Sequence, residues 1–173
     1  MDCDRRSSNL RTFCFDFSVW ELWGALLHGG KLVVVPYLTS RSSSDFYDLL
    51  CESGVTVLNQ TPSAFRSLIS AQADSLKNHR LRQVIFGGEA LEVSTLSPWY
   101  QNALNRETRL INMYGITETT VHVTYRPIDK PDTEGPIMAS RIGQHLPDLQ
   151  AYVLDPTHQP APIGVSGELY IGG

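Results

Sequence analysis

The sequence has few cysteines and few basic residues, and each shortage excludes a class of protein. Cys3, Cys14 and Cys51 lie far apart and form no CxxC pair, which argues against a disulfide framework or a zinc site and favours a reducing cytoplasm. Fourteen Lys and Arg residues are outnumbered by eighteen Asp and Glu residues, and the basic ones are scattered. Because a protein that follows a phosphate backbone normally presents a basic face, we expect no nucleic-acid partner.

Long apolar runs and several catalytic motifs are also missing. The most apolar early stretch, residues 19–27, contains Glu21 and is too short to cross a bilayer. The first residues lead into polar ones and not into the apolar core of a signal peptide, so we expect no membrane association. The histidines show no HxxxH spacing, no serine lies in a GxSxG motif, and no GxGxxG is present. Histidine-pair metal sites, serine hydrolases and dinucleotide-binding folds therefore have no support.

The sequence does alternate short β-branched runs with segments of helical periodicity. At 173 residues and 42% hydrophobic, it is large enough for one soluble domain with a real core. The pattern predicts strands at 31–35, 55–58, 83–86 and 110–113, and helices at 19–27, 44–50, 63–70 and 96–104. Strands separated by helices imply right-handed crossovers, so the predicted fold class is α/β, a mainly parallel sheet with helices on both faces.

Finer features of this fold can also be predicted. Ser44 or Asp45 is expected to cap the second helix and Ser63 the third, while 31–35 is expected to be a buried strand. After Pro127 the chain becomes rich in Pro, Gly and Asp, and the runs 150–154 and 168–171 predict a small peripheral β element.

Polar or glycine-rich segments follow three of the predicted strands. They are Asn59-Gln60-Thr61, Gly87-Gly88-Glu89 and the run from Tyr114 to Thr120. Because ligands of open α/β sheets bind at the carboxyl ends of the strands, these segments are expected to converge on one site.

Each motif has a functional and a structural interpretation. Gly87-Gly88 could let a ligand lie against the backbone or could simply form a tight turn. In the run 114–120, an aromatic ring could stack on a base, threonine hydroxyls could donate to phosphate and Glu118 could hold Mg²⁺, but a capped turn has the same composition. Asp16 could pair with an ammonium group, although the residues alone favour a helix N-cap.

Taken together, these motifs resemble nonribosomal peptide synthetase adenylation domains, within the adenylate-forming AMP-binding enzyme superfamily. The matching stretches are 15–21, 55–63, 84–90, 112–120 and 167–173. The resemblance identifies 13–173 as a partial adenylation domain, from the large N-terminal subdomain, and leaves 1–12 as an unmatched N-terminal end.

The resemblance implies a role for each motif in binding ATP and an amino acid. Asn112 would meet the adenine amino group, and Tyr114 would stack on the ring with the Gly87-Gly88-Glu89 segment on its other side. Thr117 would contact the α-phosphate region and Glu118 would bind Mg²⁺, which makes them the expected catalytic residues. Asp16 would pair with the α-ammonium group, which reverses the preference for a cap and favours an α-amino acid.

The resemblance also implies a substrate. The positions that line the family's pocket are Asp16, Phe17, Trp20, Asn59, Ile85, Gly87, Met113, Val121 and His122, a set that resembles threonine-activating members. Phe17, Trp20 and Met113 would leave room for a short side chain. Asn59 and His122 could hydrogen-bond the threonine hydroxyl, or they could satisfy one another beside a small apolar substrate.

The implied reaction converts ATP and the amino acid into an aminoacyl-adenylate and pyrophosphate. The complete parent protein would pass the acyl group to the phosphopantetheine thiol of a peptidyl-carrier domain, next to a condensation domain. The family's upstream phosphate loop, its ribose-binding aspartate and its C-terminal lysine are not in this sequence, so we expect no turnover by the isolated chain. The alternatives are an acyl- or aryl-CoA ligase of the same superfamily, which Asp16 disfavours, and a non-catalytic nucleotide-binding module.

Overall fold

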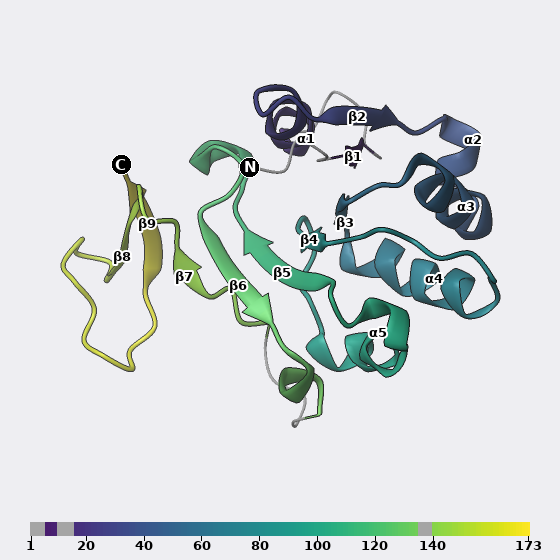
Figure 1. The fold of residues 1–173 in the computed structure, drawn as a ribbon. Helices are drawn as coiled ribbons and strands as arrows, with labels where there is room; N and C mark the ends of the chain where they lie inside the picture. Colours follow the sequence, from purple (N-terminus) through teal and green to yellow (C-terminus); the bar gives the residue numbers. More distant parts are fainter. Residues whose placement is uncertain (1–5, 10–15, 135–139) are drawn as a thin grey trace.

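A computed structural model of the protein describes residues 6–9, 16–134 and 140–173. Phe15, Cys3, Cys14 and most of the unmatched end 1–12 lie outside the described residues. The main sheet has seven strands in the order β2-β1-β3-β4-β5-β6-β7 (Figure 1). Their bounds are β1 Arg6–Asn9, β2 Lys31–Val34, β3 Val57–Gln60, β4 Gln83–Phe86, β5 Arg109–Tyr114, β6 Thr124–Ile128 and β7 Gln144–His145. β1 to β5 are parallel, and β6 and β7 are antiparallel additions at one edge.

Helices cover both faces of this sheet, as predicted. The α-helices are α1 Phe17–Leu26, α2 Tyr37–Ser40, α3 Ser43–Ser53, α4 Pro62–Ala73 and α5 Ser97–Gln101. The 3₁₀ turns are η1 Val93–Leu96, η2 Ala103–Asn105, η3 Thr117–Thr119 and η4 Lys130–Thr133. α3, α4 and α5 pack on one face, whereas α1 lies over the other face and shares a cavity with residues of β3 and β4 (Figure 1).

The main core lies between the sheet and α3, α4 and α5. Leu58, Val84 and Phe86 point to this face because side chains alternate along a strand, and all three are buried. The Phe65 ring of α4 packs edge-on against Phe86 at a centroid distance of 5.0 Å and lies tilted against Trp99 of α5 at 4.8 Å. The residues of opposite parity on β3 and β4 therefore face α1, where the predicted site lies.

Two helices begin at other residues than predicted. The Ser42 side chain caps α3 by accepting from the Asp45 N–H at 3.3 Å, so neither Ser44 nor Asp45 is the cap. Thr61, and not Ser63, caps α4 through the Ala64 N–H at 3.3 Å. The physical reason at α4 is Pro62, which favours the first helical position because it has no N–H to leave unsatisfied. The cap is then the residue before it.

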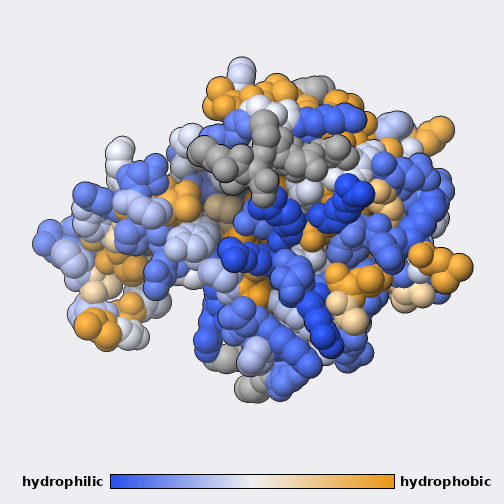
Figure 2. All heavy atoms as spheres, in the orientation of Figure 1, coloured by the Kyte–Doolittle hydropathy of each residue, from blue (hydrophilic) through white to orange (hydrophobic). Residues whose placement is uncertain are grey.

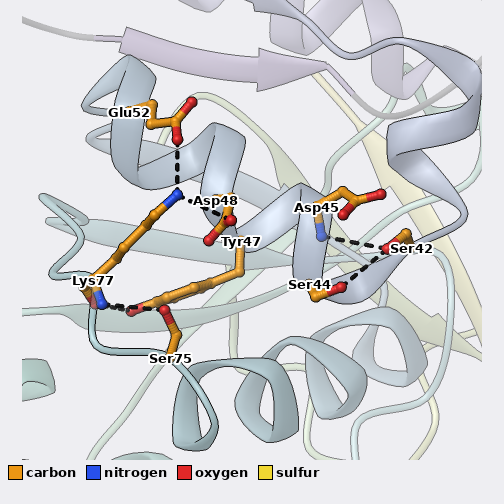
Figure 3. Close-up of polar contacts among 8 residues, drawn as sticks. All are labelled: Ser42, Ser44, Asp45, Tyr47, Asp48, Glu52, Ser75 and Lys77. Carbon is orange, nitrogen blue, oxygen red and sulfur yellow. Dashed lines mark hydrogen bonds and ion pairs between the residues drawn. The ribbon is translucent and has the colours of Figure 1, made fainter.

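The connection from α4 to β4 is held against α3 by polar contacts (Figure 3). The Lys77 ammonium pairs with Asp48 at 2.9 Å and with Glu52 at 2.7 Å, two residues one turn apart on α3. The Tyr47 hydroxyl donates to the Lys77 carbonyl oxygen at 3.0 Å, and burial raises the pKa of Tyr47 to about 12. These contacts fix the loop on the side of the sheet away from α1.

Several predicted elements differ from the structure. The run 31–35 is not a buried strand, because β2 lies at the edge of the described sheet and Val34 is 67% exposed. The predicted helix 96–104 is split, since Asn102 adopts an extended backbone and caps η2. β1, β6 and β7 were not predicted, and Pro127 within β6 weakens its strand signal. The predicted peripheral element is the separate antiparallel pair of β8 Gln150–Leu154 and β9 Glu168–Gly172.

Apolar residues are also exposed on the outer side of α1, β2 and α2. Hydrophobic residues gather at the top of Figure 2, above α1 and β2, and Trp23, Leu27 and Tyr37 are among the exposed ones. Within the described part of the chain, no helix has both the length and the apolar character needed to cross a membrane.

Candidate functional site

The first half of the predicted site is a cavity between α1 and the sheet. It has a volume of about 170 Å³ and is lined by Trp20 of α1, Asn59 of β3 and Ile85 of β4, among other residues. Asn59 and Ile85 are register partners on neighbouring parallel strands, so their side chains leave the same face of the sheet side by side. Three of the predicted pocket residues are thus brought together from distant parts of the sequence.

An aromatic cluster joins this cavity to the segment after β4. The His122 ring contacts Phe17 at a centroid distance of 5.1 Å and Trp20 at 5.2 Å, both edge-on. Gly87 packs against the same rings, because a Cβ there would lie 2.9 Å from a Phe17 ring carbon and 3.4 Å from His122. A larger residue at 87 would have to displace the ring of Phe17, so the absence of a side chain is a packing requirement here.

Asp16 stands at the N-cap position of α1 without capping it through its side chain. Its half-buried carboxylate makes no capping hydrogen bond among the described residues, and its backbone is helical with φ of −59° and ψ of −25°. The negative charge of Asp16 acts on His122, whose pKa it raises against the effect of burial. Within the described residues the carboxylate therefore does not act as the side-chain cap that the residues alone had favoured.

His122 is the most unusual polar residue of the cluster. It is only 6% exposed, and neither ring nitrogen has a hydrogen-bond partner within the described residues, so no hydrogen bond joins it to Asn59. Burial lowers its pKa to about 4, and the nearby Asp16 charge opposes this shift only in part. A neutral imidazole offers one donor and one acceptor, and a buried polar group of this kind is normally satisfied.

A strained turn sets the position of His122. Thr120 and Val121 have positive φ angles of 62° and 74°, and the His122 N–H donates to the Thr120 carbonyl at 3.0 Å in a γ-turn. A positive φ is an outlier for β-branched residues, and it persists only where the surroundings enforce it. Here Val123 donates to the Tyr114 carbonyl at 2.7 Å, and Gly115 lies so close that a Cβ would meet the Val121 carbonyl oxygen at 2.1 Å.

The neutral state of His122 predicts how stability depends on pH. Because the folded pKa of about 4 is below the ordinary 6.5, the unfolded chain binds a proton that the folded chain does not bind in this window. The contribution of neutral His122 to the free energy of unfolding is therefore fully present above pH 6.5 and is lost as pH falls toward 4. Between pH 7 and 5 we expect the free energy of unfolding to drop by about 2 kcal/mol more than in the His122→Gln variant. Urea unfolding at both pH values measures this, and equal pH dependence in the two proteins would contradict it.

The second half of the predicted site is a cavity of about 410 Å³ beyond the ends of β4 and β5. Its lining includes Gly88, Glu89, Asn112 and Tyr114, the expected adenine site, together with Met113. The Asn112 side-chain nitrogen donates to the Arg141 carbonyl at 2.9 Å, which leaves its oxygen as the acceptor that an adenine amino group needs. Met113 borders this second cavity, and Val121 lies in the γ-turn and not in the wall of either cavity.

Thr117 and Glu118 lie exposed in the turn η3 directly after β5. Thr119 closes this turn, because its hydroxyl donates to the Ile116 carbonyl at 3.0 Å and accepts from the Ile116 N–H at 3.1 Å. The described residues contain no group of three His, Cys, Asp or Glu that could hold a metal alone. A single carboxylate nevertheless fits Mg²⁺, which usually takes its other ligands from water and substrate phosphates.

The family model described as AMP-binding enzyme matches residues 4–173, which is nearly the whole chain. The chain belongs to the AMP-binding enzyme family. The match begins at residue 4, inside the stretch that the motifs left unmatched, and β1 of the main sheet lies in that stretch.

Other members of the AMP-binding enzyme family are closely similar in sequence. The chain is 55% identical over 166 residues to a dimodular nonribosomal peptide synthase of Bacillus subtilis, with 94% of the chain and 7% of that protein covered. It is 51% identical over 167 residues to malpinin synthetase of Mortierella alpina, with 95% of the chain and 2% of that protein covered. It is 47% identical over 159 residues to syringomycin synthase SyrB1 of Pseudomonas syringae pv. syringae, with 92% of the chain and 26% of that protein covered. The chain therefore spans only a small part of these relatives.

The fold of this AMP-binding family member is also known from a solved structure. The crystal structure of IdnL1 superposes with a TM-score of 0.87 at 27% identity, covering 99% of this chain and 35% of that one. This likeness supports the α/β architecture, with its mainly parallel sheet.

The expected site residues leave out other residues that line both cavities, some of them inside the matching stretches. Glu21, Gly24, Ala25, His28, Val57 and Gln83 also line the first cavity, and Ala90, Gly115, Ile116, Ser140 and Ile142 also line the second. A spacing of four residues relates Trp20 to Gly24 and Gly24 to His28, so helical periodicity could have identified them. No local signal identifies Ser140 or Ile142, because they reach the cavity from the segment before β7.

Proposed function

We propose that this chain is the amino-acid-selecting part of an adenylation domain in a nonribosomal peptide synthetase. The observation that carries the proposal is a pair of cavities on the sheet. One lies between α1 and β3 and β4, beside Asn59 and Ile85, and the other lies beyond the carboxyl ends of β4 and β5, beside Asn112 and Tyr114. The similarity to the synthetases of Bacillus, Mortierella and Pseudomonas supports it. The reaction joins a carboxylate oxygen of the amino acid to the α-phosphorus of ATP, and the bond from that phosphorus to the departing pyrophosphate breaks.

Different residues of this chain would bind the amino acid and ATP. Asp16 pairs with the α-ammonium group, and the Tyr114 ring and the Gly88 backbone hold the adenine between them. Thr117 donates its hydroxyl to the α-phosphate, and Glu118 holds Mg²⁺, whose charge offsets the negative charge of the phosphates. In the complete parent protein the acyl group passes to a phosphopantetheine thiol on a peptidyl-carrier domain, and a condensation domain uses it next.

The amino acid that fits this pocket best is L-threonine. His122 has buried ring nitrogens in a wall made by Phe17 and Trp20, and a substrate hydroxyl would supply the hydrogen bond that these nitrogens otherwise lack within the described residues. Asn59 adds a second buried polar group in the cavity between α1 and the sheet, which Trp20 also lines. The Phe17 ring, packed against Gly87, restricts the pocket to a short side chain.

Pyrophosphate exchange by the complete adenylation domain across the twenty amino acids tests this assignment. Threonine is expected to lead. Serine keeps the hydroxyl and loses one methyl group, so it should trail by roughly 10–200-fold. Valine offers no hydrogen bond to the His122 ring nitrogens and should fall by up to about 10⁴-fold. Activity with valine equal to that with threonine would contradict the assignment. The variant His122→Leu should narrow the gap between threonine and valine without abolishing exchange.

A further inference from the structure

The carboxylate of Glu89 is already bound within the protein. Its Oε2 accepts a hydrogen bond from the Ser63 backbone N–H at 3.1 Å, and its Oε1 accepts one from the Ser63 hydroxyl at 2.9 Å. Ser63 is the second residue of α4, after β3, whereas Glu89 follows β4. Both oxygens of Glu89 therefore connect the two segments that leave neighbouring strands at the site.

The first turn of α4 explains why it takes a carboxylate from elsewhere. The first amide groups of a helix have no partner inside it, and the helix dipole favours a negative charge there. Thr61 satisfies the Ala64 N–H, and Pro62 has no N–H. The Ser63 N–H is left, and Glu89 satisfies it.

The bound carboxylate directly follows two glycines, Gly87 and Gly88. Gly87 packs against Phe17 and His122 on the amino-acid side, and Gly88, with a φ of 80°, lines the nucleotide cavity. The Gly87 N–H donates to the Gln60 carbonyl at 3.3 Å. Two residues later, Glu89 accepts a hydrogen bond from Ser63, which follows Gln60 in the segment that leaves β3. Glycines do not hold a backbone conformation by themselves, so these contacts determine where the segment lies.

We propose that Glu89 is a positioning residue and not a ligand of the nucleotide. It fastens the Gly87-Gly88 segment to the start of α4 and thereby sets the wall that both substrates share. This inference rests on the proposed function, because the two cavities must bind an amino acid and ATP. It changes the role expected for Glu89 from direct contact with the cofactor to action through Ser63.

A double-mutant cycle in the complete adenylating enzyme tests the role of Glu89. The variants are Glu89→Ala, Ser63→Ala and the double variant, and the measurements are kcat, KM for ATP, KM for threonine and thermal unfolding. Glu89→Ala should raise both KM values about tenfold, because it removes two hydrogen bonds to a charged group. Ser63→Ala should raise both about threefold, because it removes the hydroxyl bond to Glu89 and keeps the backbone N–H bond. It also removes the 3.1 Å contact between the Ser63 and Thr61 hydroxyls, which does not involve the Gly87-Gly88 segment, so the double variant should equal Glu89→Ala in both KM values. Glu89→Gln, which keeps an acceptor oxygen, should restore part of the affinity.

Glu92→Ala is the matched control. Glu92 lies three residues further along, is also exposed, and its carboxylate accepts only from the Ser94 hydroxyl among the described residues, so its loss should leave both KM values unchanged. Additive effects of Ser63→Ala and Glu89→Ala, or a rise in KM for ATP alone, would overturn the proposal in favour of direct nucleotide contact. A lower melting temperature with unchanged KM values would overturn it in favour of a purely structural role. Wild-type enzyme that exchanges pyrophosphate with no amino acid would instead overturn the proposed function and this inference with it.

Discussion

Replacing Asp16 by alanine in the complete adenylating enzyme is expected to raise the Kd for the amino acid by roughly 150-fold, or about 3 kcal/mol. An ammonium group brought into a partly buried pocket loses water, and the variant removes the carboxylate proposed to pair with it. Removing one partner of a buried ion pair costs about 3–5 kcal/mol. The lower end of that range applies because Asp16 is half-buried. The Kd for ATP should change little, since Asp16 is not among the residues that line the nucleotide cavity. Calorimetry with each substrate separately measures both.

Asp74→Ala is the matched control for this variant. Asp74 is an exposed residue at the end of α4, where a negative charge has no favourable helix dipole, so its loss should leave both affinities unchanged. The structure already shows no side-chain capping bond from Asp16 within the described residues. If Asp16→Ala nevertheless weakened the binding of both substrates equally, or unfolded the protein, Asp16 would act as a helix cap and not as the partner of the ammonium group.

Glu118→Gln should lower kcat for adenylate formation about 100-fold while leaving the fold intact. The amide has the size of the carboxylate but no negative charge, so Mg²⁺ bound beside the phosphates loses its protein ligand and several kcal/mol of charge stabilisation. The exposed position of Glu118 in η3 means that the substitution disturbs no core packing. Pyrophosphate exchange at saturating amino acid, with Mg²⁺ varied, should show that a higher metal concentration recovers part of the rate.

The comparison for this variant is Glu107→Gln. Glu107 is an exposed carboxylate just before the amino end of β5, whereas Glu118 follows its carboxyl end, so the two changes remove the same charge at opposite ends of one strand. Only the change at 118 should affect exchange. A normal rate in Glu118→Gln at low Mg²⁺ would remove its proposed metal role.

Much of the parallel sheet was predictable because its strands are short apolar runs separated by helical periods. β4 at Gln83–Phe86 matches the prediction, and β5 extends it by one residue at each end. β3 at Val57–Gln60 is shifted toward Asn59, which the pattern had left after the strand. Strand ends are hard to read from sequence, because a polar residue can stay in a strand when its neighbour on the next strand supplies the backbone hydrogen bonds.

The caps, the strand β6 and the edge position of β2 were not predictable from local pattern. Several serines around Ser42 are equally good caps by composition, and only the extended backbone of Ser42 decides among them. β6 contains Pro127, and β2 has the composition of a buried strand but lies at the edge of the described sheet. Such positions depend on which strand lies next to which, and residue types along the chain carry no record of that order.

The sequence by itself determined the α/β fold class, the polar segments at the ends of the strands and, through its resemblance to adenylation domains, the residues expected to bind substrates. Only the tertiary structure decided how those residues meet. It brings His122 against Phe17 and Trp20 through a γ-turn with positive φ angles, and it uses Glu89 to join two segments at Ser63. The physical reason is that burial, desolvation and hydrogen bonding depend on neighbours far apart in the sequence. The lowered pKa of His122 and the bound carboxylate of Glu89 exist only once those neighbours are in place.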